Sequence, residues 1–411
     1  MSMTEWHPAE LGSTVHTQKG YAFKSGWYCT EGRRVVKVSN FTDDSVDCSD
    51  LICIPESIAT DYLKYALSAG DVVLQTVGSW PNNPASVVGK CVSIPSNGAG
   101  SLLNQNAVKL SPTAGLDRNF LFYLLRGEDF KTYIIGTAQG AASQAAITLD
   151  AIRSYQFSRP PLPVQQRIAG ILSVYDELIE NSQRRIKILE AMSRGLYREW
   201  FVHFRFPGHE YHPRVASALG EIPQGWAVKK VGDLVEIKKG KKPTVVFESA
   251  ESGLKRHLLI DALRGGSSLE FVMPDKLIST TVDDTIMVMD GSGSGDVFIG
   301  YEGVIGSTLG RYRVVDVSDG GPFWLFLFLD THLEEIKSKN IGSAIPHANK
   351  DFINGMSVAV APKSVLLNFE KAVTPMFGLI RSLRSKTGAL RRTRDLLLPR
   401  LLSGQIDIGE I

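Results

Sequence analysis

An internal repeat is the feature that most constrains the fold of this chain of 411 residues. Four segments recur in the same order at an offset that shrinks from 220 to 201 residues: Leu11–Gly20 at Val231–Gly240, Ala69–Leu74 at Val282–Met287, Phe120–Leu125 at Phe323–Phe328, and Asp150–Ile152 at Asp351–Ile353. A shrinking offset is expected when loops differ in length between two copies of one unit. The sequence therefore predicts two divergent copies of a module of about 200 residues.

Each copy begins with short β-rich runs and ends in a long helical stretch with a heptad seam. In the first copy the seam positions are Ile168, Leu172, Tyr175, Ile179, Ile186, Leu189, Leu196 and Trp200. Adding 201 gives the second seam: Phe369, Val373, Met376, Ile380, Leu383, Leu390, Leu397 and Leu401. Ser182, Ser193, Thr387 and Arg394 interrupt the two seams. Such seams usually pack against a partner helix, and here each copy supplies the partner of the other.

Prolines mark the starts of these helices. Pro160-Pro161-Leu162-Pro163 stiffens the chain, so we expect the first helix to begin beyond it. Pro375 lies inside the second seam and predicts either a kink or a helix that starts near Met376.

Composition describes a globular chain, with 43% hydrophobic and 21% charged residues. No apolar run is long enough to span a membrane, and the N-terminal residues do not resemble a secretory signal. The four cysteines fit no zinc template, which favours a cytoplasmic protein with ordinary thiols and no metal site. The net charge of +2 does not exclude nucleic-acid binding, because a local basic face is sufficient.

The sequence predicts no catalytic site in this chain. It has no phosphate-binding G-x-x-x-x-G-K-[ST] motif, and Gly291–Gly295 leads into another strand rather than into a helix. Its double proline, Pro160-Pro161, lacks the flanking residues with which an aminomethyltransferase holds its target amino group. Glu236-Ile237-Lys238 carries only the shorter half of a metal-dependent nuclease pattern.

Three segments resemble those of type I restriction–modification specificity (S) subunits. They are Pro160–Ala169 with the following helix to His209, Leu219–Trp226, and the closing Asp395–Gly404. The resemblance implies an α+β fold, in which two long antiparallel coiled-coil helices separate two pseudo-symmetric α/β target-recognition domains. It divides the chain into target-recognition domain 1 (1–160), long helix 1 (161–205), target-recognition domain 2 (206–361), and long helix 2 with the C-terminal tail (362–411).

The same resemblance implies a function without catalysis by this chain. Each domain would read one half of a bipartite target in double-stranded DNA, and the helices would set the spacer and dock two modification (M) subunits. Restriction (R) subunits would join that core. This chain would hold no cofactor, because S-adenosylmethionine belongs to the M subunits, and ATP and Mg²⁺ belong to the R subunits.

Polar loop residues are the candidates for DNA contacts, since base edges are read by short polar side chains and arginines while lysines hold phosphates. In the first domain they are Ser79, Trp80, Asn82, Asn83, Lys90, Asn104, Gln105, Asn106, Gln139 and Gln144. In the second they are Ser292, Ser294, Arg311, Arg313, His347, Asn349 and Lys350, with Lys238, Lys239, Lys241 and Lys242 on the DNA backbone.

Two other classes of function stay open at the level of the sequence. One is a DNA-binding scaffold or regulator that has no methyltransferase partner. The other is an independent enzyme with an unfamiliar site, which activity of the highly purified chain would reveal.

Overall fold

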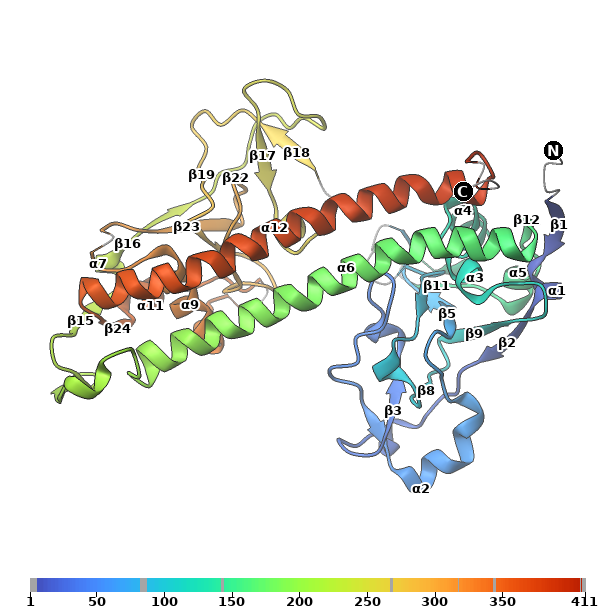
Figure 1. Cartoon of the computed structure of the whole chain (residues 1–411), viewed down its shortest axis with the longest axis horizontal. Helices are drawn as coiled ribbons and strands as arrows, with labels where there is room; N and C mark the ends of the chain where they lie inside the picture. Colours follow the sequence, from blue (N-terminus) through green and yellow to red (C-terminus); the bar gives the residue numbers. More distant parts are fainter. Residues whose placement is uncertain are drawn as a thin grey trace. The chain divides into compact units, whose positions relative to one another are not determined.

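The computed structural model of the chain comprises two compact units (Figure 1). Unit 1 contains Met1–Ile179 and Leu390–Ile411, and unit 2 contains Glu180–Ala389. The structure describes residues 6–81, 87–141, 144–266, 269–316, 318–342, 345–406 and 408. Each unit therefore holds one copy of the repeat together with a part of each long helix.

Unit 1 is built mainly from short strands and short helices. Its elements before the long helix are β1 (His7–Glu10), α1 (Leu11–Thr14), β2 (Val15–Lys19), η1 (Ser25–Trp27), β3 (Arg33–Val36), η2 (Val38–Asn40), β4 (Cys53–Ile54), α2 (Glu56–Ala59), η3 (Thr60–Tyr65), β5 (Val72–Gln75), β6 (Val77–Gly78), β7 (Cys91–Ser93), η5 (Ser96–Gly98), β8 (Leu102–Leu103), β9 (Ala107–Pro112), α3 (Arg118–Leu124), α4 (Glu128–Gly136), β10 (Gln139–Ala141), β11 (Gln144–Ala146), α5 (Leu149–Arg153) and β12 (Gln156–Arg159).

The two long helices are α6 (Leu162–Tyr197) and α12 (Lys363–Leu402). Between them lie the elements of unit 2: η6 (Arg198–Val202), η7 (His209–Tyr211), β13 (Arg214–Ser217), β14 (Gly220–Pro223), β15 (Ala227–Lys230), α7 (Val231–Leu234), β16 (Val235–Lys239), β17 (Lys255–Leu258), α8 (Ile260–Leu263), β18 (Glu270–Val272), β19 (Ser279–Thr280), β20 (Thr285–Val288), β21 (Val297–Phe298), β22 (Gly303–Ile305), β23 (Leu309–Val314), α9 (Pro322–Thr331), α10 (Leu333–Ser338), α11 (Lys350–Gly355) and β24 (Ser357–Val360).

The two units share one sheet topology. The four-stranded order β2-β9-β5-β7 in unit 1 corresponds to β16-β23-β20-β21 in unit 2. The parallel pair β3–β8 corresponds to β17–β22, and the closing pair β1–β12 corresponds to β15–β24. The structure therefore has the twofold internal repetition that the sequence predicts.

Equivalent glycines show how closely the repeat is kept. Gly20 and Gly240 follow the equivalent strands β2 and β16. A Cβ atom on Gly20 would lie 2.1 Å from the carbonyl oxygen of Asn104, and one on Gly240 would lie 2.2 Å from that of Gly306. Only glycine allows the backbone to approach a neighbouring carbonyl so closely. The same turn is thus fixed by the same residue in both units.

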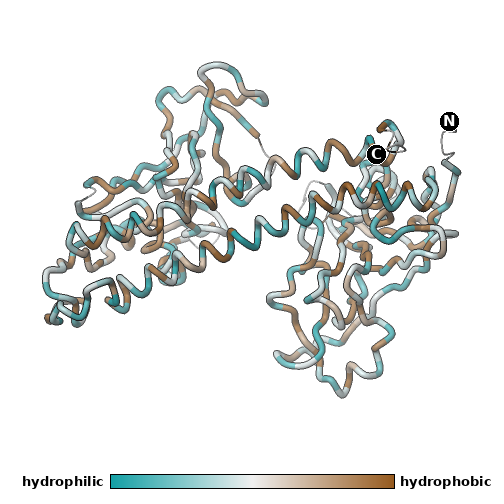
Figure 2. The backbone as a smooth tube through the Cα atoms, viewed as in Figure 1, coloured by the Kyte–Doolittle hydropathy of each residue, from teal (hydrophilic) through white to brown (hydrophobic). Residues whose placement is uncertain are grey.

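Within unit 1, the beginning of α6 packs against the end of α12. Ile168 and Leu172 share one buried cluster with Leu401, and half-buried Leu397 packs against it. Hydrophobic and hydrophilic residues alternate along both helices (Figure 2), as a one-sided apolar seam requires.

Within unit 2, the end of α6 and the following η6 pack against the beginning of α12. The rings of Phe201 and Phe369 meet edge to face with centroids 4.8 Å apart, and Trp200 lies 5.6 Å from the same ring. Ser193 Oγ lies 3.4 Å from Met376 Sδ. Residues with higher numbers on α6 contact residues with lower numbers on α12, so the two helices run antiparallel.

Two expectations about the prolines need correction. The first long helix begins at Leu162, before Pro163, because a proline in the first turn lacks only an N–H that would have no helical partner. The second begins at Lys363 and continues through Pro375, so a start near Met376 is wrong. Buried Phe369 and Val373, on the preceding turns, hold that part of the helix in the core of unit 2.

Among the described residues, no helix is both long enough and apolar enough to cross a membrane.

Candidate nucleic-acid interface

The repeat places candidate residues of the two units at one equivalent position. In unit 1, Val77 of β6 pairs with Ala146 of β11. In unit 2, an isolated bridge joins Asp290 to His347. Asp290 lies 213 residues after Val77, and His347 lies 201 residues after Ala146, which are the offsets of the surrounding repeat segments. Both units therefore have an equivalent site beside the end of their central sheet.

In unit 1 this position is a small three-stranded sheet, β10-β11-β6. Gln139 and Gln144, on its hairpin strands β10 and β11, have exposed side chains. Half-buried Ser79 and Trp80 directly follow β6. The structure thus brings these four predicted residues together.

The neighbouring turns carry three further candidates. The carbonyl of Asn106 accepts hydrogen bonds from the amides of Thr76, between β5 and β6, and Val77, the first residue of β6. Half-buried Gln105 precedes it, and the carbonyl of half-buried Lys90 accepts from the amide of Gln75 at the end of β5. These turns lie beside the three-stranded sheet.

Asn104 differs from its neighbours because it is 6% exposed. Its amide donates to the carbonyl of Val36, and it forms a bridge with Tyr21. A residue buried in this way supports the turn and does not present its side chain, so we exclude it from the interface. Asn82 and Asn83 lie outside the described residues.

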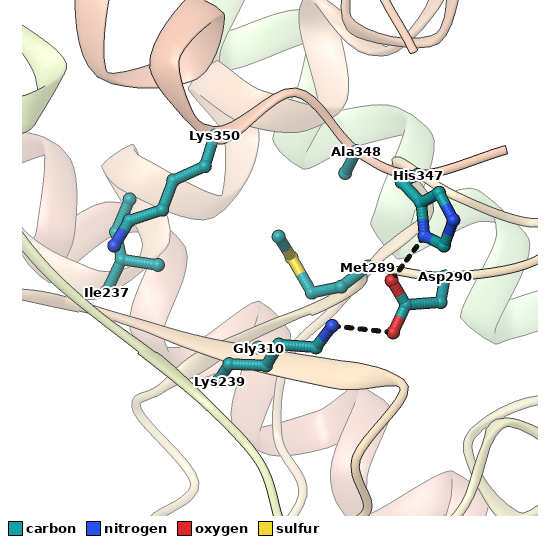
Figure 3. Close-up of a pocket in the computed structure, with 8 residues that line it drawn as sticks. All are labelled: Ile237, Lys239, Met289, Asp290, Gly310, His347, Ala348 and Lys350. Atoms are coloured by element: carbon teal, nitrogen blue, oxygen red, sulfur yellow. Dashed lines mark hydrogen bonds and ion pairs between the residues drawn. The ribbon is translucent and has the colours of Figure 1, made fainter. Parts of the chain in front are cut away.

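In unit 2 the equivalent position contains a cavity of about 290 Å³ (Figure 3). Its lining residues are Ile237, Lys239, Met289, Asp290, Gly310, His347, Ala348 and Lys350. Ile237, Met289 and Ala348 are apolar, whereas the four ionisable groups come from three separate segments. Three predicted residues, Lys239, His347 and Lys350, therefore meet around one cavity.

Asp290 connects two of these groups. Lys239 Nζ lies 2.8 Å from Asp290 Oδ2, and His347 Nδ1 lies 2.7 Å from Asp290 Oδ1. Burial opposes ionisation of Asp290, but the hydrogen bonds from Lys239 and His347 outweigh it and hold its pKa below the ordinary value. The carboxylate is thus charged near neutral pH and orients two donors at the cavity.

The remaining predicted lysines, Lys238, Lys241 and Lys242, are close to Lys239 in the sequence but are not among the residues that line the cavity. Lys238 Nζ lies 2.7 Å from Glu236 Oε1 on the same strand, β16. Lys241 and Lys242, just beyond this strand, are exposed, as is Ser292 in the turn after Asp290. These side chains are accessible to a polyanion.

Four other candidates in unit 2 have structural partners. Ser294 Oγ lies 2.8 Å from the carbonyl oxygens of both Gly291 and Pro346, to which its single proton is donated, and the residue is 1% exposed. The side chain of Asn349 caps α11 by accepting from the amide of Phe352. Both side chains are therefore part of the fold, and we exclude them from the interface.

The two arginines of β23 are also paired. Arg311 is buried and donates to the carbonyl of Ser279 and to Glu236. Arg313 holds Asp284 through two hydrogen bonds of 2.6 Å. In unit 1 the position of Arg311 is occupied by Lys109. Lys109 donates to the carbonyl of Ala66, the residue equivalent to Ser279. This position therefore has a structural role in both units.

Sequence reasoning missed Asp290 and Lys19. Lys19 faces Val108 in unit 1 as Lys239 faces Gly310 in unit 2, and its side chain is exposed. The offset of 220 was the available signal for Lys19. For Asp290 the available signal was a carboxylate placed between a strand and a glycine-rich turn.

Comparison with known proteins gives one consistent result. The family model of the type I restriction modification DNA specificity domain matches residues 3–191 and 223–364. The chain is 24% identical over 318 residues to the MjaIX type I restriction enzyme specificity subunit of Methanocaldococcus jannaschii, covering 75% of this chain and 73% of that one. It is 22% identical to the putative MjaX specificity subunit of the same organism, covering 92% and 88%.

The fold agrees with this result. The crystal structure of the type I restriction–modification S subunit from M. genitalium superposes with a TM-score of 0.59 at 16% sequence identity, covering 98% of this chain and 97% of that one. Two domains connected by long helices are the class of structure that this comparison defines. The chain belongs to the type I restriction modification DNA specificity domain family, and as a specificity subunit it is not itself an enzyme.

Proposed function

We propose that this chain is the DNA-reading subunit of a type I restriction–modification complex and that each unit reads one half of a bipartite target. The observation that carries the proposal is the pair of equivalent sites, at Val77–Ala146 in unit 1 and at Asp290–His347 in unit 2. The glutamines of the first site and the lysines and histidine of the second are suitable partners for base edges and phosphates.

The long helices supply surfaces for partner subunits. Val174 and Ile188 on α6 are both 53% exposed, and Leu396 on α12 is 66% exposed. Exposed apolar side chains on both helices suit protein contacts. We propose that the helices dock two M subunits, which supply S-adenosylmethionine, and that R subunits with ATP and Mg²⁺ join this core. The cytoplasm is where such a complex meets its DNA.

Methylome sequencing of cells with and without the gene tests the proposal. We expect a split adenine-methylated motif that disappears on deletion and returns on complementation. Persistence of every methylated motif after deletion would instead favour a regulator without a methyltransferase partner.

A chimaera then tests whether the two units read independently. Replacing about residues 1–150 with the equivalent segment of a related subunit should change one half of the motif and leave the other unchanged. His347→Ala provides the matching change in unit 2, where relaxed specificity is expected only in the other half. Changes in both halves in either experiment would contradict independent reading.

A further inference from the structure

Unit 1 carries a group of aromatic rings that the proposed base-reading site does not use. The ring of Tyr21 contacts those of Tyr62 and Tyr65 in tilted arrangements, with centroids 4.4 Å and 5.4 Å away. Trp27 lies 5.8 Å from Tyr62, and half-buried Tyr28 belongs to the same cluster. These rings come from the loop after β2 and from η3.

Three lysines lie over these rings. Lys24 Nζ is 5.3 Å from the ring centroid of Trp27, Lys37 Nζ is 4.0 Å from Tyr28, and Lys64 Nζ is 5.1 Å from Tyr65. A ring below an ammonium group attracts it without neutralising its charge. We name Lys24, Lys37, Lys64 and the five rings the aromatic–lysine surface.

The surface carries three lysines, while η3 also carries the carboxylate of Asp61, and the neighbouring Arg33 is paired with Glu56. Residues 16–37 include five basic residues, Lys19, Lys24, Arg33, Arg34 and Lys37, and one acidic residue, Glu31. Within the described part of the chain, Lys24, Lys37 and Lys64 form no ion pair with a carboxylate. The charge is therefore available to an anionic partner, although the chain as a whole carries only +2.

Backbone bridges connect Tyr21 of this surface to the proposed site of unit 1. Tyr21 is bridged to Asn104, two residues before Asn106, whose carbonyl accepts from the amide of Val77 in β6. In unit 2 the loop after the equivalent strand begins with exposed Lys241 and Lys242. In unit 1 the first lysine of the corresponding loop is Lys24, five residues after the end of β2.

We infer that the aromatic–lysine surface holds the phosphate backbone of duplex DNA beside the half-site that unit 1 reads. Lysine ammonium groups suit phosphates because they are point charges without a base-reading pattern. The rings restrict the lysine side chains before DNA arrives, so less side-chain entropy is lost on binding. The inference rests on the proposed function for the identity of the duplex as the partner.

The experiment uses the full chain with Lys24, Lys37 and Lys64 all changed to Gln. Fluorescence anisotropy measures binding to two duplexes of equal length, one with the motif found by methylome sequencing and one of random sequence, over a series of salt concentrations. Arg153→Gln is the control, because it removes an exposed charge from α5, at the end of unit 1 opposite α2 in Figure 1.

The slope of log K against log salt is negative, and each phosphate contact contributes about 0.9 to its magnitude. Because three lysines are changed, we expect this magnitude to decrease by about two to three for both duplexes. At low salt the affinity should fall at least about tenfold, and the preference for the motif should be unchanged. Arg153→Gln should leave the slope unchanged.

A triple variant with the wild-type slope would overturn the inference while leaving sequence recognition intact. Loss of preference with an unchanged slope would also overturn it, because the lysines would then read bases. If the unaltered chain showed no preference for the motif, the proposed function would fail, while a lower slope on the random duplex would still support the surface.

Discussion

In unit 1 a capping side chain accepts a hydrogen bond from an amide in the first turn of a helix. In unit 2 a carboxylate of the second long helix accepts the equivalent hydrogen bond. Asp117 caps α3 by accepting from the amide of Phe120 at 2.9 Å. At the start of α9 the cap position is Gly321, and Glu370 of α12 accepts from the amide of Trp324 at 2.8 Å. A Cβ atom on Gly321 would lie 2.1 Å from the Glu370 carboxylate, so the glycine leaves the space that this carboxylate occupies.

This arrangement predicts that the stability of unit 2 depends on pH. Burial raises the pKa of Glu370 to about 7, against the opposing effect of the hydrogen bonds from Trp324 and Phe323. Between the ordinary carboxyl pKa and this value, the folded state holds a proton that the unfolded state lacks. Stability is therefore present at low pH and is lost as the pH rises, by up to about 3 kcal/mol between about pH 5 and pH 8.

Glu370→Gln should remove that dependence, since glutamine keeps an acceptor and cannot ionise. Urea denaturation of the chain at several pH values provides the measurement. Glu221→Gln, which changes an exposed carboxylate of the same unit, should retain the wild-type pH profile. An unchanged profile in Glu370→Gln would show that another group titrates.

Within unit 1, an ionic cluster interrupts the apolar seam. Arg394 of α12 lies 2.5 Å from Asp176 of α6, and 3.5 Å from Asp44. Asp176 also accepts from the hydroxyl of Tyr123 at 2.6 Å and lies 3.8 Å from Arg126. Burial raises the pKa of Tyr123, and the neighbouring Asp176 raises it further, so the hydroxyl stays protonated as the donor.

Removing one side of this pair should cost more than removing both. Arg394→Leu leaves the carboxylate of Asp176 without its closest cation and should destabilise unit 1 by about 3 kcal/mol. Adding Asp176→Leu should recover part of that loss, because no unpaired charge remains. Urea denaturation measures both, and Arg392→Leu on the exposed face is the control. Additive losses in the double variant would show that the two residues are not coupled.

Proline should affect stability at only one of two positions in the long helices. Pro375, in the interior of α12, removes a backbone donor, and Pro375→Ala should raise the free energy of unfolding by about 1–3 kcal/mol. Pro163→Ala, in the first turn of α6, should change it by less than about 0.5 kcal/mol, since that N–H has no helical acceptor. Thermal unfolding of both variants tests the difference, and a destabilised Pro375→Ala would show that the proline fits its surroundings.

At the scale of the whole molecule, α6 connects the two recognition units. Four residues inserted after Ser182 add roughly one turn, about 6 Å, to this helix. The coiled coil can absorb such an insertion by local unwinding. We expect both half-sites to be retained while the spacer between them lengthens by one or two base pairs, each about 3.4 Å. The methylome of the insertion variant measures this, and altered half-sites with the original spacer would contradict it.

The sequence by itself determined the repeat, the helical seams and the family. These follow from local periodicity and from motifs whose order is preserved along the chain, and Gly20 and Gly240 show that the repeat persists down to single backbone contacts. The offset also predicts which residues of the two copies are equivalent, so that Lys19 was recoverable from Lys239.

Only the tertiary structure decided which polar residues face outward. The sequence predicted Ser294 and Arg311 as DNA contacts. In the structure, Ser294 donates to the carbonyl of Pro346, and Arg311 donates to the carbonyl of Ser279 and to Glu236. Gln139 and Gln144, with similar chemistry, remain exposed on a hairpin. Whether a buried donor finds its acceptor depends on segments more than thirty residues away, and hydrogen bonds between such segments leave no periodic pattern in the sequence.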